Sequence, residues 1–459
     1  MEEQRSLYIQ TFGCQMNVSD SDKIIALMKG IGYLPIDDSS RADLIILNTC
    51  SVRAKAEQKV YNHLSGLKGL KKRNSRLILA VGGCVAQQEG ERLLEKVPHL
   101  DLVFGTHNLH LLPEMVQAAE QGRRAVEVDF LDRETRANLF PFNDTSGGIS
   151  RFVTVMQGCD NFCSYCIVPH VRGREISRPS GEILREITGM ASQGVKEVTL
   201  LGQNVNSYGL KEENELTFAG LLAAVAAVDG IERIRFTTSH PKDISAELIS
   251  SFAELPKVCS HIHLPAQAGS DAVLSRMNRG YSRNQYLEKV AALKHARPHI
   301  QMTGDMIVGF PGETEAEFQE TLSLMEEVRF ADLFSFIYSP RPGTAAAEYP
   351  DTVDRAEKQD RLNRLQELQR TITREANIKL VGSRQQVLIE GNSKQAGQVY
   401  GRTSCNKIVN IAAESLQQGD LVEVVVTKGF QNSLVARCID SGDAAVNDRQ
   451  GLPDDGGGS

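Results

Sequence analysis

Three cysteines within eight residues, Cys159, Cys163 and Cys166, constrain this chain more than any other feature of its sequence. Thiols this close together are too tightly spaced for ordinary disulfides, and they suit a single metal centre. In an iron–sulfur cube, three cysteines would bind three irons and leave the fourth iron open to a cofactor. The alternative is a zinc loop, because structural zinc takes four ligands, and His170 or a distant cysteine would then complete the set.

The same loop carries an aromatic residue, Tyr165, directly before its last cysteine. This pattern resembles the C-x3-C-x-aromatic-C motif of the radical S-adenosylmethionine (SAM) superfamily. The resemblance implies that the three cysteines hold a 4Fe–4S cluster whose open iron chelates the amino and carboxylate groups of SAM. It also implies that an electron from the cluster cleaves SAM to methionine and a 5′-deoxyadenosyl radical.

The length of 459 residues predicts two or three domains with ample core. A formal net charge of −7 means that a nucleic-acid partner would need a local basic face. The sequence has neither an apolar run long enough to span a membrane nor an apolar region behind its N-terminus, so we expect no membrane segment and no signal peptide. Nine cysteines in such a chain predict a cytoplasmic protein that uses thiols for metal binding or catalysis. The tail, residues 442–459, is expected to be disordered.

Strand and helix patterns alternate in the N-terminal segment, residues 1–121. This alternation predicts a parallel sheet with helices on its faces. The predicted strands are residues 6–11, 43–47, 76–81 and 102–104, and the predicted helices are residues 21–30, 54–70, 87–97 and 111–121.

Cys14, Cys50 and Cys84 each follow one of the first three predicted strands. Their separations of 36 and 34 residues each match one strand–helix unit, so the three thiols should emerge together at the carboxyl ends of parallel strands. Glycines at positions 13, 82 and 83 would allow tight turns there. The arrangement favours a second cluster with an open iron, and the alternative is three small buried core residues.

After a predicted linker at residues 122–144, residues 145–377 contain six strand–helix repeats. The predicted strands are residues 151–157, 197–201, 233–237, 261–264, 304–308 and 333–337. Five helices are predicted between them, at residues 183–193, 218–228, 246–255, 284–296 and 315–328. Together they predict a partial (β/α)6 barrel with its site at the carboxyl ends of the strands.

Polar residues and glycines follow several of these barrel strands. Such loops would fit a SAM site at the barrel mouth, although Gly and Pro in them could also serve only to turn the chain. Taken alone, a histidine at a strand end is more often structural than catalytic. The candidate SAM contacts are Tyr165, Gly202, Gln203, Asn204, Ser239, His240, Gln267 and Gly309.

Residues 354–378 have apolar positions at helical spacing and predict a connecting helix. Its arginines at positions 361, 364, 370 and 374 are expected to form a solvated face, with contact to RNA as the alternative. The next segment, residues 378–441, contains five short predicted strands, at residues 385–390, 398–401, 408–411, 421–427 and 433–437.

These five strands predict a small antiparallel β-barrel of the OB-like kind, which often binds oligonucleotides. The alternative is an accessory packing domain. We interpret Cys259, Cys405 and Cys438 as structural thiols. In this segment the basic residues outnumber the acidic ones: Arg384, Lys394, Arg402, Lys407, Lys428 and Arg437 against Glu390, Glu414, Asp420, Glu423 and Asp440.

With these segments in order, the chain resembles the methylthiotransferases over nearly its whole length. The resemblance rests on residues 11–17, 48–53, 158–178 and 339–344. It is strongest to members that act on an isopentenylated adenosine beside the anticodon of tRNA. Ala266 and Ala268 depart from the pattern, which would have Val and Ser there.

The resemblance implies an N-terminal domain in which Cys14, Cys50 and Cys84 hold an auxiliary 4Fe–4S cluster that supplies sulfur. It implies a central radical SAM core and a C-terminal RNA-binding barrel of the TRAM type. Two SAM molecules would be used: one would methylate a sulfur of the auxiliary cluster, and the other would generate the radical that removes hydrogen from C2 of the adenine.

The implied partners are the tRNA anticodon arm with its isopentenylated adenosine and an electron donor like flavodoxin or ferredoxin. We expect a monomer. Since both clusters must flank one substrate, the cysteine end of the N-terminal sheet should face the barrel mouth.

Other functions remain as alternatives. A sister methylthiotransferase would modify threonylcarbamoyl-adenosine in tRNA or an aspartate of a ribosomal protein. The protein-modifying relative would be favoured by a more acidic C-terminal barrel, the opposite of the balance seen here. An electron-transfer module or a non-catalytic RNA-binding protein would leave the SAM-type motif without a purpose.

Overall fold

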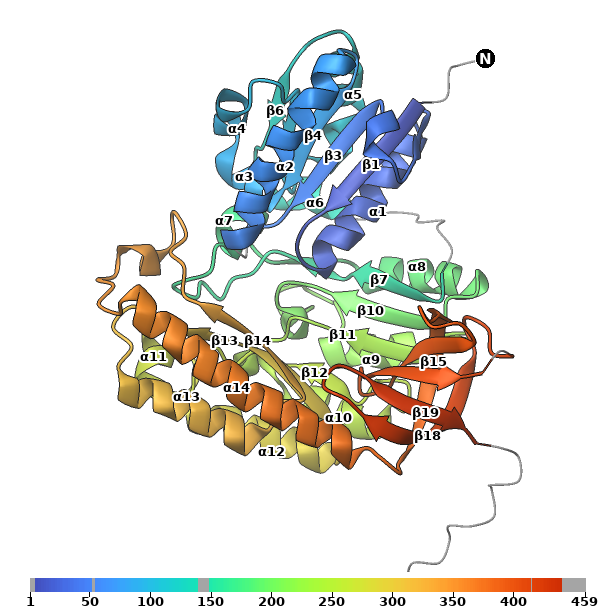
Figure 1. Ribbon diagram of the computed structural model, residues 1–459, viewed down its shortest axis with the longest axis vertical. Helices are drawn as coiled ribbons and strands as arrows, with labels where there is room; N and C mark the ends of the chain where they lie inside the picture. Colours follow the sequence, from blue (N-terminus) through green and yellow to red (C-terminus); the bar gives the residue numbers. More distant parts are fainter. Residues whose placement is uncertain (1–4, 52–53, 139–147, 414, 440–459) are drawn as a thin grey trace, which may run out of the picture.

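The computed structural model describes residues 5–51, 54–138, 148–413 and 415–439 (Figure 1). The N-terminal domain is stacked on the central barrel, and the small C-terminal barrel lies beside the central one. The predicted tail at 442–459 lies outside the described residues, as does part of the predicted linker. In the described ranges, no helix has the length and apolarity needed to cross a membrane.

The N-terminal domain contains a six-stranded sheet in the order β2-β1-β3-β4-β5-β6, with every neighbouring pair parallel. The central strands β3 and β4 are buried throughout, because helices cover both faces of the sheet. The predicted parallel sheet is thus confirmed. Its strands are β1 (Arg5–Thr11), β2 (Tyr33–Pro35), β3 (Leu44–Thr49), β4 (Ile78–Gly83), β5 (Leu102–Phe104) and β6 (Ala125–Glu127).

The helices of this domain differ from the prediction in two places. α1 (Gln15–Lys29) begins directly after Cys14 and not at residue 21. The helix predicted for residues 87–97 is two helices, α3 (Cys84–Glu89) and α4 (Glu91–Lys96), because Gly90 between them has a φ of +52°. The remaining two are α2 (Ala54–Arg73) and α5 (Leu112–Glu120).

Two edge strands were missed by the sequence analysis, because β2 and β6 have only three residues each and show no periodicity. β6 and α6 (Arg133–Asn138) lie in the segment predicted as a linker. β6 pairs with β5, so the sheet extends past residue 121. Arg136 on α6 is buried and donates hydrogen bonds to the carbonyl oxygens of Arg172 (3.3 Å) and Arg174 (2.9 Å), so this segment fixes the following domain in place.

The central domain is the predicted partial barrel. Its strands pair in parallel as β11-β10-β7 and β12-β13-β14, and a bridge between Ile234 and Val258 links the two sets. The largest hydrophobic core lies between these strands and the helices outside them. The strands are β7 (Ser150–Thr154), β10 (Glu197–Leu201), β11 (Arg233–Phe236), β12 (His261–His263), β13 (Gln301–Val308) and β14 (Asp332–Ile337). The outer helices are α8 (Ser180–Ser192), α9 (Phe218–Ala226), α10 (Ala246–Glu254), α12 (Arg283–Ala296) and α13 (Glu315–Val328).

Short elements complete the barrel mouth. β8 (Met156–Gln157) pairs antiparallel with β9 (Ile176–Ser177) on either side of the three-cysteine loop. α7 (Val168–Arg172) follows that loop, and α11 (Asp271–Arg276) follows β12.

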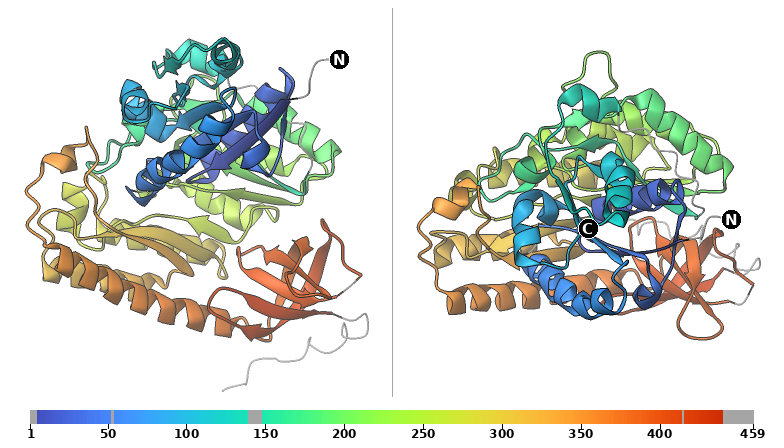
Figure 2. Two further views of the ribbon diagram at one scale, coloured as in Figure 1. Left: turned by 45° about the horizontal axis from the view of Figure 1, so that its top comes forward. Right: turned by 90° about the horizontal axis from the view of Figure 1, so that it is seen from above.

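The long helix α14 (Arg355–Lys379) runs along the outside of the barrel toward the C-terminal domain (Figure 2). The prediction that its arginines form a solvated face is wrong for Arg361, whereas the Arg364 side chain is 36% exposed. Arg361 is only 1% exposed, and its Nη1 lies 2.9 Å from Oε2 of Glu313. Arg364 pairs with Glu315 across 2.6 Å. These two arginines therefore hold α14 on the barrel, and they are not free for RNA.

The C-terminal domain is a closed five-stranded barrel in the order β15-β16-β17-β19-β18. All neighbouring pairs are antiparallel except β17 and β19, which are parallel. A ring with an odd number of strands cannot alternate direction throughout, so closure requires one parallel pair. The predicted barrel is thus confirmed, with this one departure from a purely antiparallel sheet. Its strands are β15 (Arg384–Asn392), β16 (Gln398–Thr403), β17 (Ile408–Ala412), β18 (Leu421–Gly429) and β19 (Leu434–Cys438).

Two buried arginines of β11 join this barrel to the central domain. Arg233 donates hydrogen bonds to the carbonyl oxygens of residues 386 and 402, and Arg235 donates to those of residues 403 and 404. Arg235 also pairs with the buried Glu197 across 2.9 Å. Four backbone carbonyls of the C-terminal barrel therefore accept hydrogen bonds from two buried guanidinium groups of the central domain.

Candidate functional site

The three-cysteine loop begins where β8 ends. Gly158 has a φ of +85°, and a Cβ there would lie 2.1 Å from the carbonyl oxygen of Arg174, so only glycine fits. Cys159 and Cys163 are buried and Cys166 is half-buried. Burial raises the pKa of Cys159 to about 11 and that of Cys166 to about 12. The site therefore disfavours free thiolate, and a metal that replaces the proton would remove this cost.

The arrangement of side chains around this loop bears on the zinc alternative. Among the described residues, no three His, Cys, Asp or Glu side chains are placed to hold a single metal ion. His170, one candidate for the fourth ligand in the zinc alternative, is exposed. A cube makes a different demand, because each thiolate binds its own iron and the sulfurs stay further apart. The donor set of three thiols without a fourth ligand fits a cube with one open iron.

The second set of cysteines lies at the carboxyl edge of the N-terminal sheet. Cys14 precedes α1, Cys50 follows β3, and Cys84 opens α3 after β4. A hydrogen bond from Cys50 is the main cause that lowers the pKa of Cys14 to about 6. Gly13 packs so closely on Cys50 that a Cβ at position 13 would lie 2.2 Å from the Cys50 Cβ. The structure thus brings the three thiols to one place.

Helix α7 connects the two sets of cysteines. It starts two residues after Cys166, and its flanking residue Ile167 and its own Val171 pack against Cys84. Figure 1 shows α7 beside α3 beneath the N-terminal domain. The carbonyl oxygen of Val171 accepts a hydrogen bond from Oγ1 of Thr106 at 2.6 Å. The cysteine edge of the N-terminal sheet therefore faces the loop of the barrel.

Arg172, the last residue of α7, was missed by the sequence analysis. It is buried, and its Nη2 lies 2.8 Å from Oδ2 of Asp20. The positive charge of Arg172 also lowers the pKa of Cys14 and opposes the effect of burial on Cys84. Since its neighbours come from α1, α3 and α7, only tertiary structure could reveal this cation beside the second set of thiols.

Two residues after β10 present unpartnered polar atoms. Oε1 of Gln203 accepts a hydrogen bond from the backbone N–H of Gly158 at 2.5 Å, and Nδ2 of Asn204 donates to Oδ2 of Asp243 at 2.8 Å. Within the described part of the chain, Nε2 of Gln203 and Oδ1 of Asn204 are buried without a partner. Buried polar atoms are rarely left unpaired in a native protein, so these atoms fit a bound ligand.

Two residues after β11 show the same feature. Oγ of Ser239 and Nε2 of His240 are buried, with no hydrogen-bond partner among the described residues. Nδ1 of His240 accepts a hydrogen bond from the backbone of Lys242 at 3.2 Å, which assigns the imidazole proton to Nε2. Burial, with Arg279 and Lys242 nearby, lowers the pKa of His240 to about 2. This histidine is therefore a neutral hydrogen-bond donor and not a general acid.

The two glycines among the predicted SAM contacts have defined local roles. A Cβ on Gly202 would lie 2.4 Å from Cγ of Met156, and one on Gly309 would lie 2.3 Å from Cγ of Lys358. The N–H of Gly309 already donates to Glu313 at 2.6 Å. Both glycines therefore allow a neighbouring side chain, Met156 or Lys358, to pack directly against the backbone of the loop.

Tyr165 and Gln267 are engaged in contacts within the protein. The ring of Tyr165 packs in an apolar cluster that includes Ala268 and Phe310. Gln267 has a φ of +72°, and its backbone N–H donates to the carbonyl oxygen of Asp305 at 2.9 Å. No sequence motif indicated Arg279, which lies against both Cys163 and Tyr165.

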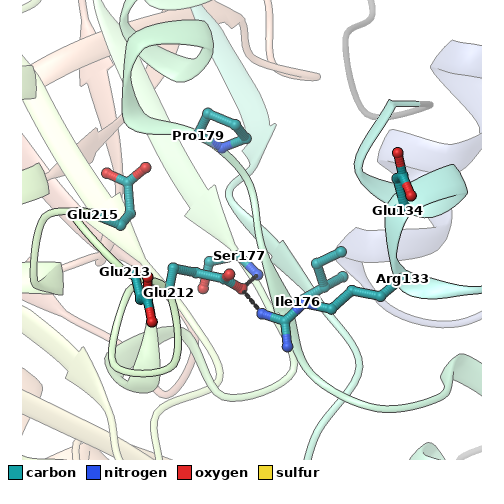
Figure 3. A pocket seen from close by; sticks show the side chains of 8 residues that line it. All are labelled: Arg133, Glu134, Ile176, Ser177, Pro179, Glu212, Glu213 and Glu215. Atoms are coloured by element: carbon teal, nitrogen blue, oxygen red, sulfur yellow. Dashed lines mark hydrogen bonds and ion pairs between the residues drawn. The ribbon is translucent and has the colours of Figure 1, made fainter.

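One cavity of about 420 Å³ lies between α6, β9 and the loop before α9 (Figure 3). It contains none of the six cysteines, and Arg133 forms an ion pair with Glu212 at its rim. Its other charged residues, Glu134, Glu213 and Glu215, are carboxylates that would repel a phosphate backbone. We therefore do not assign it to the cofactor or to RNA.

Comparison with protein families gives three matches along the chain. Residues 6–105 match the family described as Uncharacterized protein family UPF0004, residues 153–325 match the Radical SAM superfamily, and residues 379–439 match the TRAM domain. The three matches follow the three structural domains in order.

Curated relatives extend over the whole chain. The tRNA-2-methylthio-N(6)-dimethylallyladenosine synthase of Geobacter sulfurreducens is 68% identical over 445 residues, which cover 97% of this chain and 100% of the relative. The protein of the same name from Geotalea uraniireducens is 67% identical and covers 95% of this chain and 99% of its own.

Solved structures show the fold. The radical SAM methyltransferase TsrM from Kitasatospora setae matches with a TM-score of 0.58 and 16% identity, over 75% of this chain and 77% of its own. The cobalamin-dependent SAM radical enzyme OxsB matches with a TM-score of 0.50 and 12% identity, over 81% of this chain and 56% of its own.

Proposed function

The chain belongs to the radical SAM family of tRNA-2-methylthio-N(6)-dimethylallyladenosine synthases, and from this premise we propose that it adds a methylthio group to C2 of N6-isopentenyladenosine beside the tRNA anticodon. One observation carries the proposal: α7, which directly follows the three-cysteine loop of the radical SAM barrel, packs with Ile167 against Cys84 of the N-terminal domain. A reaction that joins sulfur to an unactivated carbon needs both centres at one substrate.

The proposed SAM-type 4Fe–4S cluster is held by Cys159, Cys163 and Cys166. When bound there, SAM supplies the radical that removes hydrogen from C2. Acid–base groups could not remove it, because the aromatic C–H bond at C2 is not activated. The protein positions the cofactor. Nε2 of Gln203 and Nε2 of His240 are available as hydrogen-bond donors and Oδ1 of Asn204 as an acceptor, and Oγ of Ser239 can serve as either.

We propose that Cys14, Cys50 and Cys84 hold the auxiliary 4Fe–4S cluster that supplies the sulfur. The convergence of these thiols and the buried cation Arg172 beside them support this assignment. An iron–sulfur cluster with three thiolates carries net negative charge. Arg172 is paired with Asp20, but its Nη1 is buried without a hydrogen-bond partner among the described residues and is available as a donor to such a cluster. Two SAM molecules would be used in each cycle, as the sequence resemblance implies.

The proposed substrate is the anticodon arm of tRNA, held in part by the C-terminal barrel. Of the six basic residues named in this segment, Arg402 pairs with Glu390 across 2.9 Å, and Lys407 donates to the carbonyl oxygen of Ala331 at 3.0 Å. These two are engaged within the protein. The remaining basic side chains are exposed, and among them Lys394 and Lys428 are our candidates for phosphate contacts.

A one-electron donor like flavodoxin or ferredoxin would reduce the SAM-type cluster. We propose that the protein acts as a monomer in the cytoplasm. None of the nine cysteines, all of which lie in the described ranges, forms a disulfide, which agrees with a reducing compartment.

An anaerobic assay of the cluster-reconstituted protein with SAM and a reductant tests the proposal. Three substrates are offered separately: tRNA with isopentenyladenosine, tRNA with threonylcarbamoyl-adenosine, and the ribosomal-protein target. Mass spectrometry should find a methylthio group on the isopentenylated base alone. Methylthiolation of another substrate would move the chain to a sister activity. Absence of SAM cleavage would overturn the assignment as an enzyme.

A further inference from the structure

We propose that Arg279 is a positioning residue for the SAM-type cluster: its guanidinium donates a hydrogen bond to the sulfur of Cys163 and raises the reduction potential of the cluster. This inference rests on the proposed assignment of Cys159, Cys163 and Cys166 as cluster ligands. It assigns a task to a side chain that no sequence motif indicated.

The contacts of Arg279 are specific. Its Nη1 lies 3.3 Å from Sγ of Cys163 and 3.4 Å from Oη of Tyr165. Its Nη2 donates to the carbonyl oxygen of Pro265 at 2.9 Å, and its Nε donates to Oη of Tyr281 at 3.0 Å. All three nitrogens of the guanidinium are therefore engaged, and one of them faces the sulfur.

The guanidinium has no carboxylate to balance it. Arg279 is only 4% exposed, and no ion pair of the described residues includes it. A buried cation without a counter-ion is costly, unless another negative group lies close by. The nearest candidates are the thiol of Cys163 and the phenols of Tyr165 and Tyr281. A cluster bound through Cys163 would provide the missing negative charge.

Tyr281 and Pro265 fix the orientation of the planar Arg279 guanidinium before any cluster binds. Oη of Tyr281 donates to the carbonyl oxygen of Ala266 at 2.8 Å, so it is oriented to accept from Nε of Arg279. These acceptors belong to the loop after β12 and to the segment before α12, and they do not depend on the cysteines. A lysine could not reproduce three contacts from one rigid plane.

The electrostatic consequence follows from the charge of the cluster. The sulfur of an iron-bound thiolate still accepts hydrogen bonds, and such bonds tune the potential of an iron–sulfur cluster. One electron from the external donor makes the cluster more negative, and no proton moves. A nearby cation stabilises the reduced form more than the oxidised form. The cluster is therefore easier to reduce with Arg279 present.

The test is an EPR-monitored redox titration of the full-length reconstituted protein without SAM, which the reduced cluster would cleave; SAM is added only to a separate reduced sample that is frozen at once. The signal that responds to SAM reports the SAM-type cluster. Arg279→Gln removes the positive charge but keeps an amide donor. Arg279→Lys keeps the charge but loses the planar set of donors. Tyr281→Phe removes the hydroxyl that accepts from Nε of Arg279. Arg276→Gln is the matched control, because Arg276 lies three residues away and pairs with Glu317 at 3.0 Å, without side-chain contact to the cysteines.

We expect Arg279→Gln to lower the reduced-to-oxidised ratio at a fixed potential about tenfold, because a hydrogen bond from a charged donor changes an equilibrium by roughly that factor. For one electron, tenfold corresponds to about 59 mV toward negative potential. Arg279→Lys and Tyr281→Phe should shift the reduction potential less, and Arg276→Gln should leave the reduction potential unchanged. If Arg279→Gln does not fold, Arg279→Lys and Tyr281→Phe decide, each by a smaller shift of the reduction potential in the same direction.

An unchanged potential at wild-type iron content in the Arg279 variants would overturn this role. That result would leave the proposed function intact if the unsubstituted protein still made product. If the unsubstituted protein gave no SAM-responsive signal, the cluster assignment itself would fail. The two failures are thus distinguished within one experiment.

Discussion

Nη2 of Arg172 lies 2.8 Å from Oδ2 of Asp20, and this buried ion pair ties the two halves of the candidate site together. Asp20 lies on α1, six residues after Cys14, and Arg172 ends α7, six residues after Cys166. The Arg172 and Asp20 side chains are 3% and 7% exposed. A pair this deeply buried fixes geometry, because neither charge can turn away into water.

Replacement of Asp20 by Asn should lower the free energy of unfolding by about 3–5 kcal/mol, since it strands a buried guanidinium. Urea unfolding followed by circular dichroism measures the change. The control is Arg370→Ala, which breaks an exposed pair with Glu367 at 2.5 Å and should cost no more than about 1 kcal/mol. Equal effects of the two substitutions would show that the Asp20 pair does not hold the domains.

Triple replacement of Cys159, Cys163 and Cys166 by Ala should abolish SAM cleavage. About half of the iron should remain, because we propose a second cluster of the same size. Chromatography for 5′-deoxyadenosine and an iron assay give the two readouts. SAM cleavage at the wild-type rate in this variant would contradict the assignment of these three cysteines as ligands of the SAM-type cluster.

Triple replacement of Cys14, Cys50 and Cys84 by Ala should give the complementary result. SAM cleavage should persist, while sulfur insertion into tRNA stops because the proposed sulfur source is gone. Mass spectrometry of digested tRNA distinguishes modified from unmodified adenosine. If this variant still made the methylthio product, the sulfur would have to come from elsewhere.

Gly13→Ala should weaken the second set of thiols selectively. The new Cβ would lie 2.2 Å from the Cβ of Cys50 and force that residue to move, so bound iron should fall toward half while SAM cleavage remains. Gly32→Ala is the matched control, because Gly32 also has a positive φ, +87°, but open space around it. Similar iron loss in both variants would point to general backbone strain instead.

Replacement of Lys394 or Lys428 by Glu should weaken tRNA binding, measured as affinity against salt concentration. Removal of one phosphate contact should reduce the salt slope by about 0.7–0.9. Lys407→Ala should instead reduce stability, because Lys407 donates to the carbonyl oxygen of Ala331 in the central domain. An unchanged slope in both Glu variants would favour an accessory packing role for this barrel.

These point substitutions test RNA contact more sharply than deletion of residues 378–441. Without the barrel, Arg233 and Arg235 would lose four backbone acceptors, and the surface of the central domain that the barrel covers would be exposed to water. The deletion would therefore disturb the central domain together with tRNA binding, and reduced binding alone would not identify the cause.

The sequence by itself determined the features that are local or periodic. The spacing of Cys159, Cys163 and Cys166 requires only eight residues. The convergence of Cys14, Cys50 and Cys84 followed from strand–helix alternation, because parallel strands bring their carboxyl ends to one edge. The five strands of the C-terminal barrel were visible for the same reason, since alternation of side chains has a fixed period in a strand.

Only the tertiary structure decided the contacts between distant segments. Arg279 is 116 residues from Cys163 in the chain, yet it lies 3.3 Å from its sulfur. Arg361 belongs to a helix whose pattern predicted a solvated face, and packing of α14 on the barrel buried it against Glu313. The physical reason is the same in both cases. Periodicity tells which face of an element is apolar, but charged groups find their partners only when packing brings elements together.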